Sequence, residues 1–192
     1  AKRLVFTASL ATDDSCCRSS PSVYVGPCDS QRRLKRLYSG ALRAFGLHTL
    51  AKFHETAFAA VAAIESGENI WSHSMAATPT VLLNALADHA LTLSDVTLMQ
   101  LHLEHADAVA VPALDGHLRH RCFFAGKATR ELINQGRADY VPMFLSEIPK
   151  LFRHGDQRID TALVQVSTPD QHGNCSLGIS VEATAAACAV AK

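Results

Sequence analysis

Short apolar runs alternate with amphipathic stretches from residue 55 to residue 192, and this alternation predicts strands and helices in turn. Residues 55–67 place their apolar side chains on one face of a helix, with Gly67 where a C-terminal cap is expected. Residues 162–166 read Ala-Leu-Val-Gln-Val, a compact run closed by Ser-Thr-Pro that predicts a buried strand. The alanine-rich residues 181–192 predict a helix. The last third of the chain is therefore expected to form a strand, a polar loop and a helix.

The same alternation extends over the middle of the chain. The predicted strands cover residues 69–73, 95–103, 116–124, 137–141 and 159–166. The predicted helices cover residues 79–91, capped by Thr78 with Pro79 in the first turn, residues 129–133, stopped by Gly136, and a segment that Ser146 caps and Gly155 ends. Alternating strands and helices with short connections predict an α/β fold, with a parallel sheet covered by helices on both faces.

Composition supports one sizeable domain and narrows the partners. The chain has 192 residues, 48% of them hydrophobic and 19% charged, which is ordinary for a globular protein with a real core. Its 18 basic and 18 acidic residues give a formal net charge of zero, so no basic surplus favours a nucleic acid or an anionic membrane. No apolar stretch approaches the roughly 20 residues that span a bilayer. A small molecule is the expected partner.

Residues 1–50 lack the regular pattern. They contain Ser/Cys/Arg clusters and the basic run 32–36, and we expect an extension of unknown role that is dispensable to an α/β domain at residues 51–192. An Arg/Ser-rich start is typical of an organelle presequence, but Asp13, Asp14 and Asp29 count against one. The expected location is the cytoplasm, or the mitochondrion if the extension is a presequence.

The loop after the strand at 159–166 is the first candidate site, because open α/β sheets bind ligands at the carboxyl ends of their strands. Gly173 and Gly178 permit a positive φ or a close approach of backbone N–H groups to a ligand oxygen. The candidate binding residues in or beside this loop are Gln165, Ser167, Asp170, His172, Gly173, Ser176, Gly178 and Ser180. The alternative is a tight connection in which the glycines only turn the chain and Ser180 caps the next helix.

A second loop, residues 74–78, is expected at the same edge of the sheet and adds Ser74 and Thr78 as weaker candidates. Metal ligation is not expected. His102, His105 and Asp107, like the pair His117 and His120, lack a third ligand fixed by spacing.

The cysteines also lack the spacing of a zinc site. The six cysteines contain no Cys-x-x-Cys pair, and we expect Cys175 to be a packing thiol. No cofactor is expected.

Two segments resemble the acetyl-CoA hydrolase/transferase family, which includes 4-hydroxybutyrate and acetate CoA-transferases. Residues 165–180, QVSTPDQHGNCSLGIS, are similar to the family's signature loop. Residues 123–152 are similar as well, and the similarity runs from about Glu55 to Lys192. The matching positions in the second segment are Arg130, Gly136, Asp139, Tyr140, Pro142 and residues 145–149.

The resemblance implies a CoA-transferase-like α/β domain, the type shared with sugar-phosphate isomerases. It also implies double-displacement chemistry, in which a glutamate attacks an acyl-CoA to give a mixed anhydride and CoA thiolate. The thiolate then attacks the glutamyl carbonyl, which gives a glutamyl-CoA thioester and releases the acyl group as a carboxylate. In the family that glutamate belongs to a second, C-terminal domain, and no residue here matches its motif. The chain is thus expected to shape the acyl-CoA cleft, to contribute no catalytic residue and to be inactive alone.

The partners implied by the resemblance are an acyl-CoA, a small carboxylate or water, and the C-terminal domain of the same protein, with homo-oligomers left open. Two alternatives stay open. One is a sugar-phosphate isomerase-like domain, disfavoured by the absence of a P-loop or a Gly-x-Gly-x-x-Gly motif. The other is a non-catalytic module that binds a small molecule.

Overall fold

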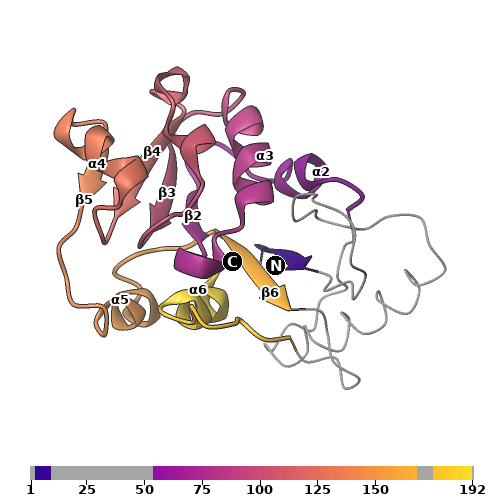
Figure 1. Cartoon of the computed structure of the whole chain (residues 1–192), viewed down its shortest axis with the longest axis vertical. Helices are drawn as coiled ribbons and strands as arrows, with labels where there is room; N and C mark the ends of the chain where they lie inside the picture. Colours follow the sequence, from indigo (N-terminus) through magenta and orange to yellow (C-terminus); the bar gives the residue numbers. More distant parts are fainter. Residues whose placement is uncertain (1–2, 10–53, 168–174, 192) are drawn as a thin grey trace, which may run out of the picture.

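A single parallel sheet organises the molecule (Figure 1). The computed structural model describes residues 3–9, 54–167 and 175–191. In this part of the chain six strands lie in the order β1-β6-β2-β3-β4-β5, and every neighbouring pair is parallel. The strands are β1 (Arg3–Ser9), β2 (Asn69–Ser72), β3 (Val96–Gln100), β4 (Leu118–Cys122), β5 (Ala138–Tyr140) and β6 (Thr161–Ser167). The predicted parallel sheet is confirmed.

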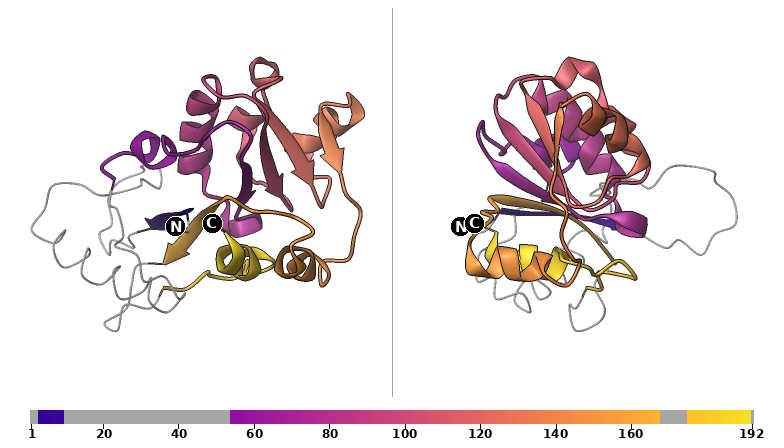
Figure 2. Two further views of the ribbon diagram at one scale, coloured as in Figure 1. Left: turned by 180° about the vertical axis from the view of Figure 1, so that it is seen from behind. Right: turned by 90° about the vertical axis from the view of Figure 1, so that its left-hand side faces the viewer.

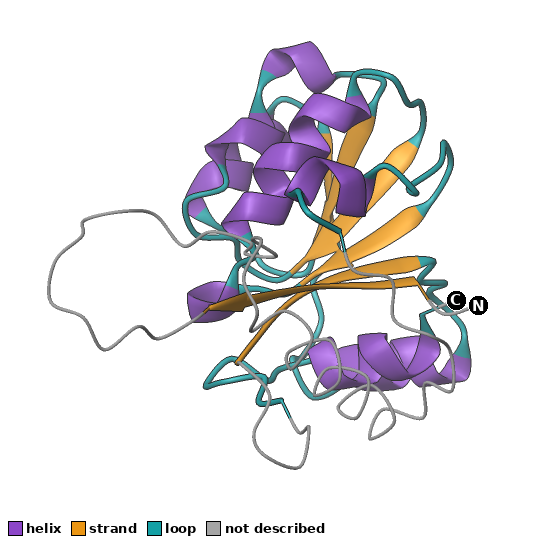
Figure 3. Cartoon of the chain, turned by 90° about the vertical axis from the view of Figure 1, so that its right-hand side faces the viewer, coloured by secondary structure: helices purple, strands orange, loops and turns teal. Residues whose placement is uncertain are grey.

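Helices cover both faces of this sheet, as predicted (Figure 3). The α-helices are α2 (Ala57–Val61), α3 (Thr80–Ala90), α4 (Lys127–Asn134), α5 (Ile148–His154) and α6 (Thr184–Val190). The described residues also form three 3₁₀ turns, η1 (Met75–Ala77) between β2 and α3, and η2 (Asp107–Ala110) and η3 (Pro112–Leu114) between β3 and β4. Helices α5 and α6 lie together on one side of β6, whereas α2, α3 and α4 lie on the other side (Figure 2).

The two-residue period of the strands divides the core into two clusters. Successive side chains of a strand point to opposite faces of the sheet. Ile70, Leu98 and Leu163 therefore pack with α2 and α3, whereas their neighbours Trp71, Met99 and Val164 pack with α5 and α6. Because both of its faces are buried, β6 reads as a nearly continuous apolar run in the sequence.

Trp71 is the centre of the second cluster. Its indole ring is fully buried and lies 5.1 Å from the ring of Phe152. Its Nε1–H donates a hydrogen bond of 2.9 Å to Oγ1 of Thr184, which fixes the start of α6 against β2. Ala186 and Ala187 are buried on the same helix, and their small side chains let α6 lie close to the sheet.

Residues 3–9 were expected to lie outside the domain, and for them this prediction is wrong. Strand β1 pairs with β6 along its whole length, from Arg3 opposite Thr161 to Ser9 opposite Ser167. The pairing makes β6 an interior strand. Periodicity could not reveal it, because the partners are more than 150 residues apart in sequence and only the fold brings them together. Residues 10–50 lie outside the described residues. Apart from residues 3–9, the predicted domain division therefore stays a prediction.

The helix starts differ by one to three residues from those predicted. Helix α2 begins at Ala57 rather than residue 55, and α4 begins at Lys127 rather than residue 129. Helix α6 begins at Thr184, so Ser180 does not cap it. Helix α3 begins at Thr80 with Pro79 at the N-cap, one residue later than predicted, and α5 begins at Ile148 with Glu147 rather than Ser146 at the N-cap. Gly155 has a left-handed backbone, with φ of 84°, as its predicted place after α5 requires. The predicted cap at Gly67 is wrong, because α2 covers only Ala57–Val61 and ends at the C-cap Ala62.

Candidate functional site

Strands β2 and β6 lie side by side, and the first candidate loop leaves β2 opposite Leu163, four residues before β6 ends at Ser167. The two strands pair in register from Ile70 opposite Thr161 to Ser72 opposite Leu163. The chain leaves β2 for α3 on one face of the sheet and leaves β6 for α6 on the other face. Neighbouring strands whose connections diverge in this way form the switch point at which open α/β sheets bind ligands.

His73 ties the two loops to each other, although the sequence analysis did not single it out. Its backbone N–H donates to the Leu163 carbonyl over 2.9 Å, which extends the pairing of β2 with β6 by one residue. Its ring Nδ1 lies 3.1 Å from the carbonyl oxygen of Gln165, and Nε2 lies 2.6 Å from that of Ser180. The side chain is fully buried, and this burial lowers the pKa of His73 against the opposing effect of the two carbonyls.

Glu182 is the second residue that the sequence analysis missed. Its Oε1 accepts a 3.1 Å hydrogen bond from the backbone N–H of Ser74 and lies 4.0 Å from Nε2 of His73. Burial raises the pKa of Glu182 to about 7, although the N–H groups of Ser74 and Ala183 act in the opposite direction. Its Oε2 is buried and has no hydrogen-bond partner among the described residues.

The signal that could have found these two residues is their position. His73 comes directly after a strand, and Glu182 stands just before an alanine-rich helix, two residues after the signature segment 165–180. A titratable side chain next to a buried strand end is a natural candidate for a paired group. Nothing in the sequence spacing, however, shows that residues 109 positions apart are neighbours.

Ser74 and Thr78 hold the backbone of the first loop in place. The Ser74 hydroxyl is buried, donates to the Ser72 carbonyl and accepts from the Leu101 N–H, each over 3.1 Å. The Thr78 hydroxyl donates to the Met75 carbonyl over 2.8 Å and accepts from the Glu104 N–H over 3.1 Å. Both predicted site residues thus lie at the expected edge, with their hydroxyl groups joining β2 to the residues that follow β3.

The second loop is closed at its base by two serines. The Ser167 N–H donates to the Ser176 carbonyl, and the Ser176 N–H donates to the Ser167 hydroxyl, both over 2.9 Å. The Ser176 hydroxyl also accepts from the Gly178 N–H over 3.0 Å. The predicted residues Asp170, His172 and Gly173 lie between these serines and outside the described residues. The two closing serines therefore fix where this polar segment leaves and rejoins the domain.

Gly178 has a φ of +74°, a left-handed conformation that side chains rarely adopt. A Cβ added there would meet no atom within 4 Å. The positive φ by itself favours glycine at this position, and the binding role of Gly178 stays a prediction.

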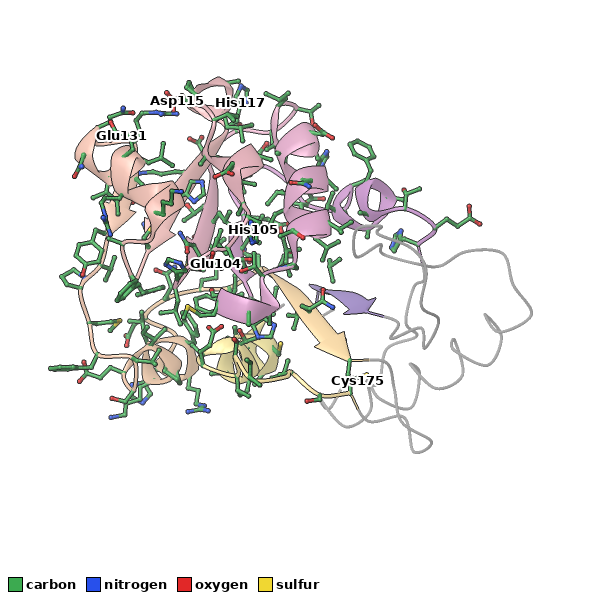
Figure 4. The ribbon with its side chains drawn as sticks, viewed as in Figure 1. Glu104, His105, Asp115, His117, Glu131 and Cys175 are labelled. Carbon is green, nitrogen blue, oxygen red and sulfur yellow. The ribbon has the colours of Figure 1, made fainter. Side chains whose placement is uncertain are left out.

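The histidine pairs considered as metal ligands have other partners. His102 Nε2 lies 2.7 Å from Oε1 of Glu104, and His120 Nε2 lies 2.7 Å from the Val109 carbonyl. Glu104 and His105 lie beside η1, whereas His117 is at the opposite end of the sheet (Figure 4). Within the described residues, no group of three His, Cys, Asp or Glu side chains could hold a metal ion. Cys175 is partly buried and packs against the cluster of Trp71, as expected of a packing thiol.

Comparison with known proteins identifies the family. The model of the acetyl-CoA hydrolase/transferase N-terminal domain matches residues 49–192. The chain belongs to this family. The match covers both loops of the site and all described strands except β1.

Curated relatives carry CoA-transferase names. The chain is 42% identical over 126 residues to the succinyl-CoA:acetate/propanoyl-CoA:succinate CoA transferase of Fasciola hepatica, covering 65% of this chain and 26% of that protein. It is 34% identical over 137 residues to the 4-hydroxybutyrate coenzyme A transferase of Clostridium kluyveri, covering 71% and 32%. The chain thus spans about a quarter to a third of the curated relatives that it matches.

Solved structures agree with the fold. RipA from Yersinia pestis matches with a TM-score of 0.60 and 26% identity, over 76% of this chain and 33% of that one. The 4-hydroxybutyrate CoA-transferase from Porphyromonas gingivalis matches with a TM-score of 0.57 and 26% identity, over 71% and 30%. The fold is therefore that of a CoA-transferase-like α/β domain. No helix in the described residues is long and apolar enough to cross a membrane.

Proposed function

We propose that this chain is the cleft-forming N-terminal domain of an enzyme that exchanges CoA between an acyl-CoA and a small carboxylate. The observation that carries the proposal is the family match over both strand-end loops, which the structure ties together through His73 and Glu182. Curated relatives that act on acyl-CoA substrates support transfer to a carboxylate rather than to water.

In this proposal the nucleophile is a glutamate supplied from outside residues 1–192, and this chain supplies the wall that receives the acyl-CoA. Backbone N–H groups of the loop after β6 would stabilise the oxyanion that develops on the attacked thioester. Gln165, Ser167, Asp170, His172, Gly173, Ser176 and Gly178 are the proposed lining of this wall, with Ser74, Thr78 and Ser180 holding it in place. No cofactor besides the CoA of the substrate is needed.

The test is acyl exchange by the full-length protein. Incubation with acetyl-CoA and isotope-labelled succinate, propionate, butyrate or 4-hydroxybutyrate should give labelled acyl-CoA for at least one acid, with ping-pong kinetics because a covalent intermediate is formed. Residues 1–192 alone should give none. Failure of the full-length protein with every acid, or turnover by residues 1–192 alone, would overturn the proposal.

A further inference from the structure

His73 and Glu182 stand out because both are buried, both are titratable and neither has a role in the chemistry proposed above. His73 comes from the end of β2, and Glu182 comes from the segment that leads into α6. Their contacts reach three separate parts of the chain: the carbonyl of Gln165 in β6, the carbonyl of Ser180 and the N–H of Ser74. The two side chains therefore sit where both candidate loops leave the sheet.

The partners of the His73 ring decide its favoured protonation state. Both ring nitrogens face backbone carbonyl oxygens, at 3.1 Å and 2.6 Å, and a carbonyl oxygen can only accept a hydrogen bond. A neutral imidazole carries one N–H, so one nitrogen would direct a lone pair at a carbonyl. The imidazolium carries two N–H groups and satisfies both contacts.

The partners of Glu182 lead to the same assignment. Oε2 of Glu182 is buried without a hydrogen-bond partner among the described residues in either protonation state, and a protonated carboxyl would add an unpaired O–H donor there. As a carboxylate, Glu182 accepts the Ser74 N–H and faces the histidine at 4.0 Å. Burial opposes the charge on each residue taken alone, lowering the pKa of His73 and raising the pKa of Glu182. The ion pair as a whole is neutral, and it leaves fewer buried polar atoms unpaired than two neutral side chains would.

No other charged side chain competes for this pair in the part of the chain that the structure describes. From β6 the facing residue is Gln165, which is uncharged. Beside η1, His102 and Glu104 bond to each other over 2.7 Å, and the Met75 N–H meets only the carbonyl of His102. Neither His73 nor Glu182 makes a second ion pair within 4.0 Å in the described residues.

We propose that a buried His73 imidazolium and Glu182 carboxylate pair fixes the segment 180–183 on the ends of β2 and β6, and so positions the acyl-CoA-facing loop. Both residues act as positioning residues, since they hold the backbone on which the loop is mounted. The proposal rests on the proposed function for its catalytic consequence, but the pair itself can be tested without any turnover.

The direct test follows the titration of His73 in the full-length protein labelled with ¹⁵N-histidine, with the signal assigned by its loss in His73→Gln. Glu182→Gln keeps the shape and the oxygen that accepts from Ser74 but removes the negative charge. The midpoint for His73 should fall by about 1 pH unit or more in this variant, because an opposite charge within about 4–6 Å stabilises the protonated form. Glu131→Gln, an exposed change on α4, is the matched control and should leave the midpoint unchanged. An equal midpoint in wild type and Glu182→Gln, or no titration of His73 in either protein, would overturn the pair.

The positioning role is tested by acyl exchange from acetyl-CoA on the same preparations. Glu182→Gln should lower kcat/KM by roughly 10-fold or more, chiefly through a higher KM for acyl-CoA, by analogy with misplacement of a bound substrate. Glu182→Asp should restore part of the loss, and Glu131→Gln should behave as wild type. The positioning role would be wrong if Glu182→Gln lowered the titration midpoint of His73 but left the rate of acyl exchange unchanged. If the wild type showed no acyl exchange, the proposed function would be wrong. The titration of His73 would still test whether the ion pair with Glu182 forms.

Discussion

At the scale of single residues, the site depends on backbone conformation as much as on side-chain chemistry. Gly178 and Glu182 both have positive φ, 74° and 36°, within a few residues of each other. Such conformations cost free energy in a residue with a Cβ and persist where neighbouring contacts hold them. At Glu182 those contacts are the hydrogen bond to Ser74 and the approach to His73.

Gly178→Ala should lower the free energy of unfolding by about 1 kcal/mol, because alanine disfavours the left-handed backbone while the space around the position is open. Gly178→Asn should cost less, since asparagine tolerates this conformation better than alanine. Urea unfolding of the wild type and the two variants measures their order of stability. If alanine and asparagine were equally destabilising, backbone conformation would not be the reason for the glycine.

Asp160 offers a test of pH dependence. Its carboxylate is buried, accepts the Asn69 N–H over 3.1 Å and accepts from Nε of Arg158 over 2.5 Å. Burial acts to raise the pKa of Asp160, but the hydrogen bonds from Asn69 and Arg158 outweigh it and hold the pKa below the ordinary 3.8. A lowered folded pKa means that the carboxylate stabilises the fold above pH 3.8, and that this contribution disappears as the pH falls through the folded value.

We therefore expect Asp160→Asn to be less stable than wild type at pH 7, with the difference shrinking below pH 3.8. Chemical unfolding of both proteins at pH 7, 5 and 3 measures this difference in the free energy of unfolding. Glu131→Gln, an exposed change on α4, serves as the control and should show no such trend. A stability difference that stayed constant from pH 7 to pH 3 would contradict the role of the Asp160 charge.

At the scale of elements, the hydrogen bond from Trp71 to Thr184 joins α6 to the sheet within an apolar contact. Thr184→Val keeps the shape of the side chain but removes the acceptor of the Trp71 indole N–H, which is fully buried. An unsatisfied buried donor costs about 1–3 kcal/mol, so the variant should be destabilised by that amount. In the background Trp71→Phe, where the donor is already absent, Thr184→Val should cost much less. A double-mutant cycle by urea unfolding gives the coupling, and a coupling near zero would mean that the bond contributes nothing to the attachment of α6.

At the scale of the whole molecule, the sheet joins the beginning of the chain to its last strand. Deletion of residues 1–9 removes β1 and leaves one side of β6 without its seven backbone partners. We expect a lower unfolding midpoint and faster amide hydrogen exchange in residues 161–167, with residues 96–100 of β3 less affected. Unchanged stability and exchange would restore the original expectation that the whole extension is dispensable.

The sequence by itself determined the fold class and the region of the site. Apolar runs such as 162–166 can be read locally, because a strand buried on both faces needs an unbroken apolar surface whatever lies beside it. The signature residues 165–180 indicated the loop after β6, since motif and strand end are adjacent in the chain; the family match covers this loop, and its binding role stays a prediction. Helix starts were off by one to three residues because capping depends on local geometry, as at Pro79 and Glu147.

Only the tertiary structure decided which distant residues meet. The pairing of β1 with β6 joins residues more than 150 positions apart, and His73 meets Glu182 across 109 positions. No periodicity encodes such contacts, because each depends on the order of strands in the sheet and on the face to which each connection turns. The burial that shifts the pKa values of His73 and Glu182 arises from that same packing, so their role could be found only once β2 and β6 were placed side by side.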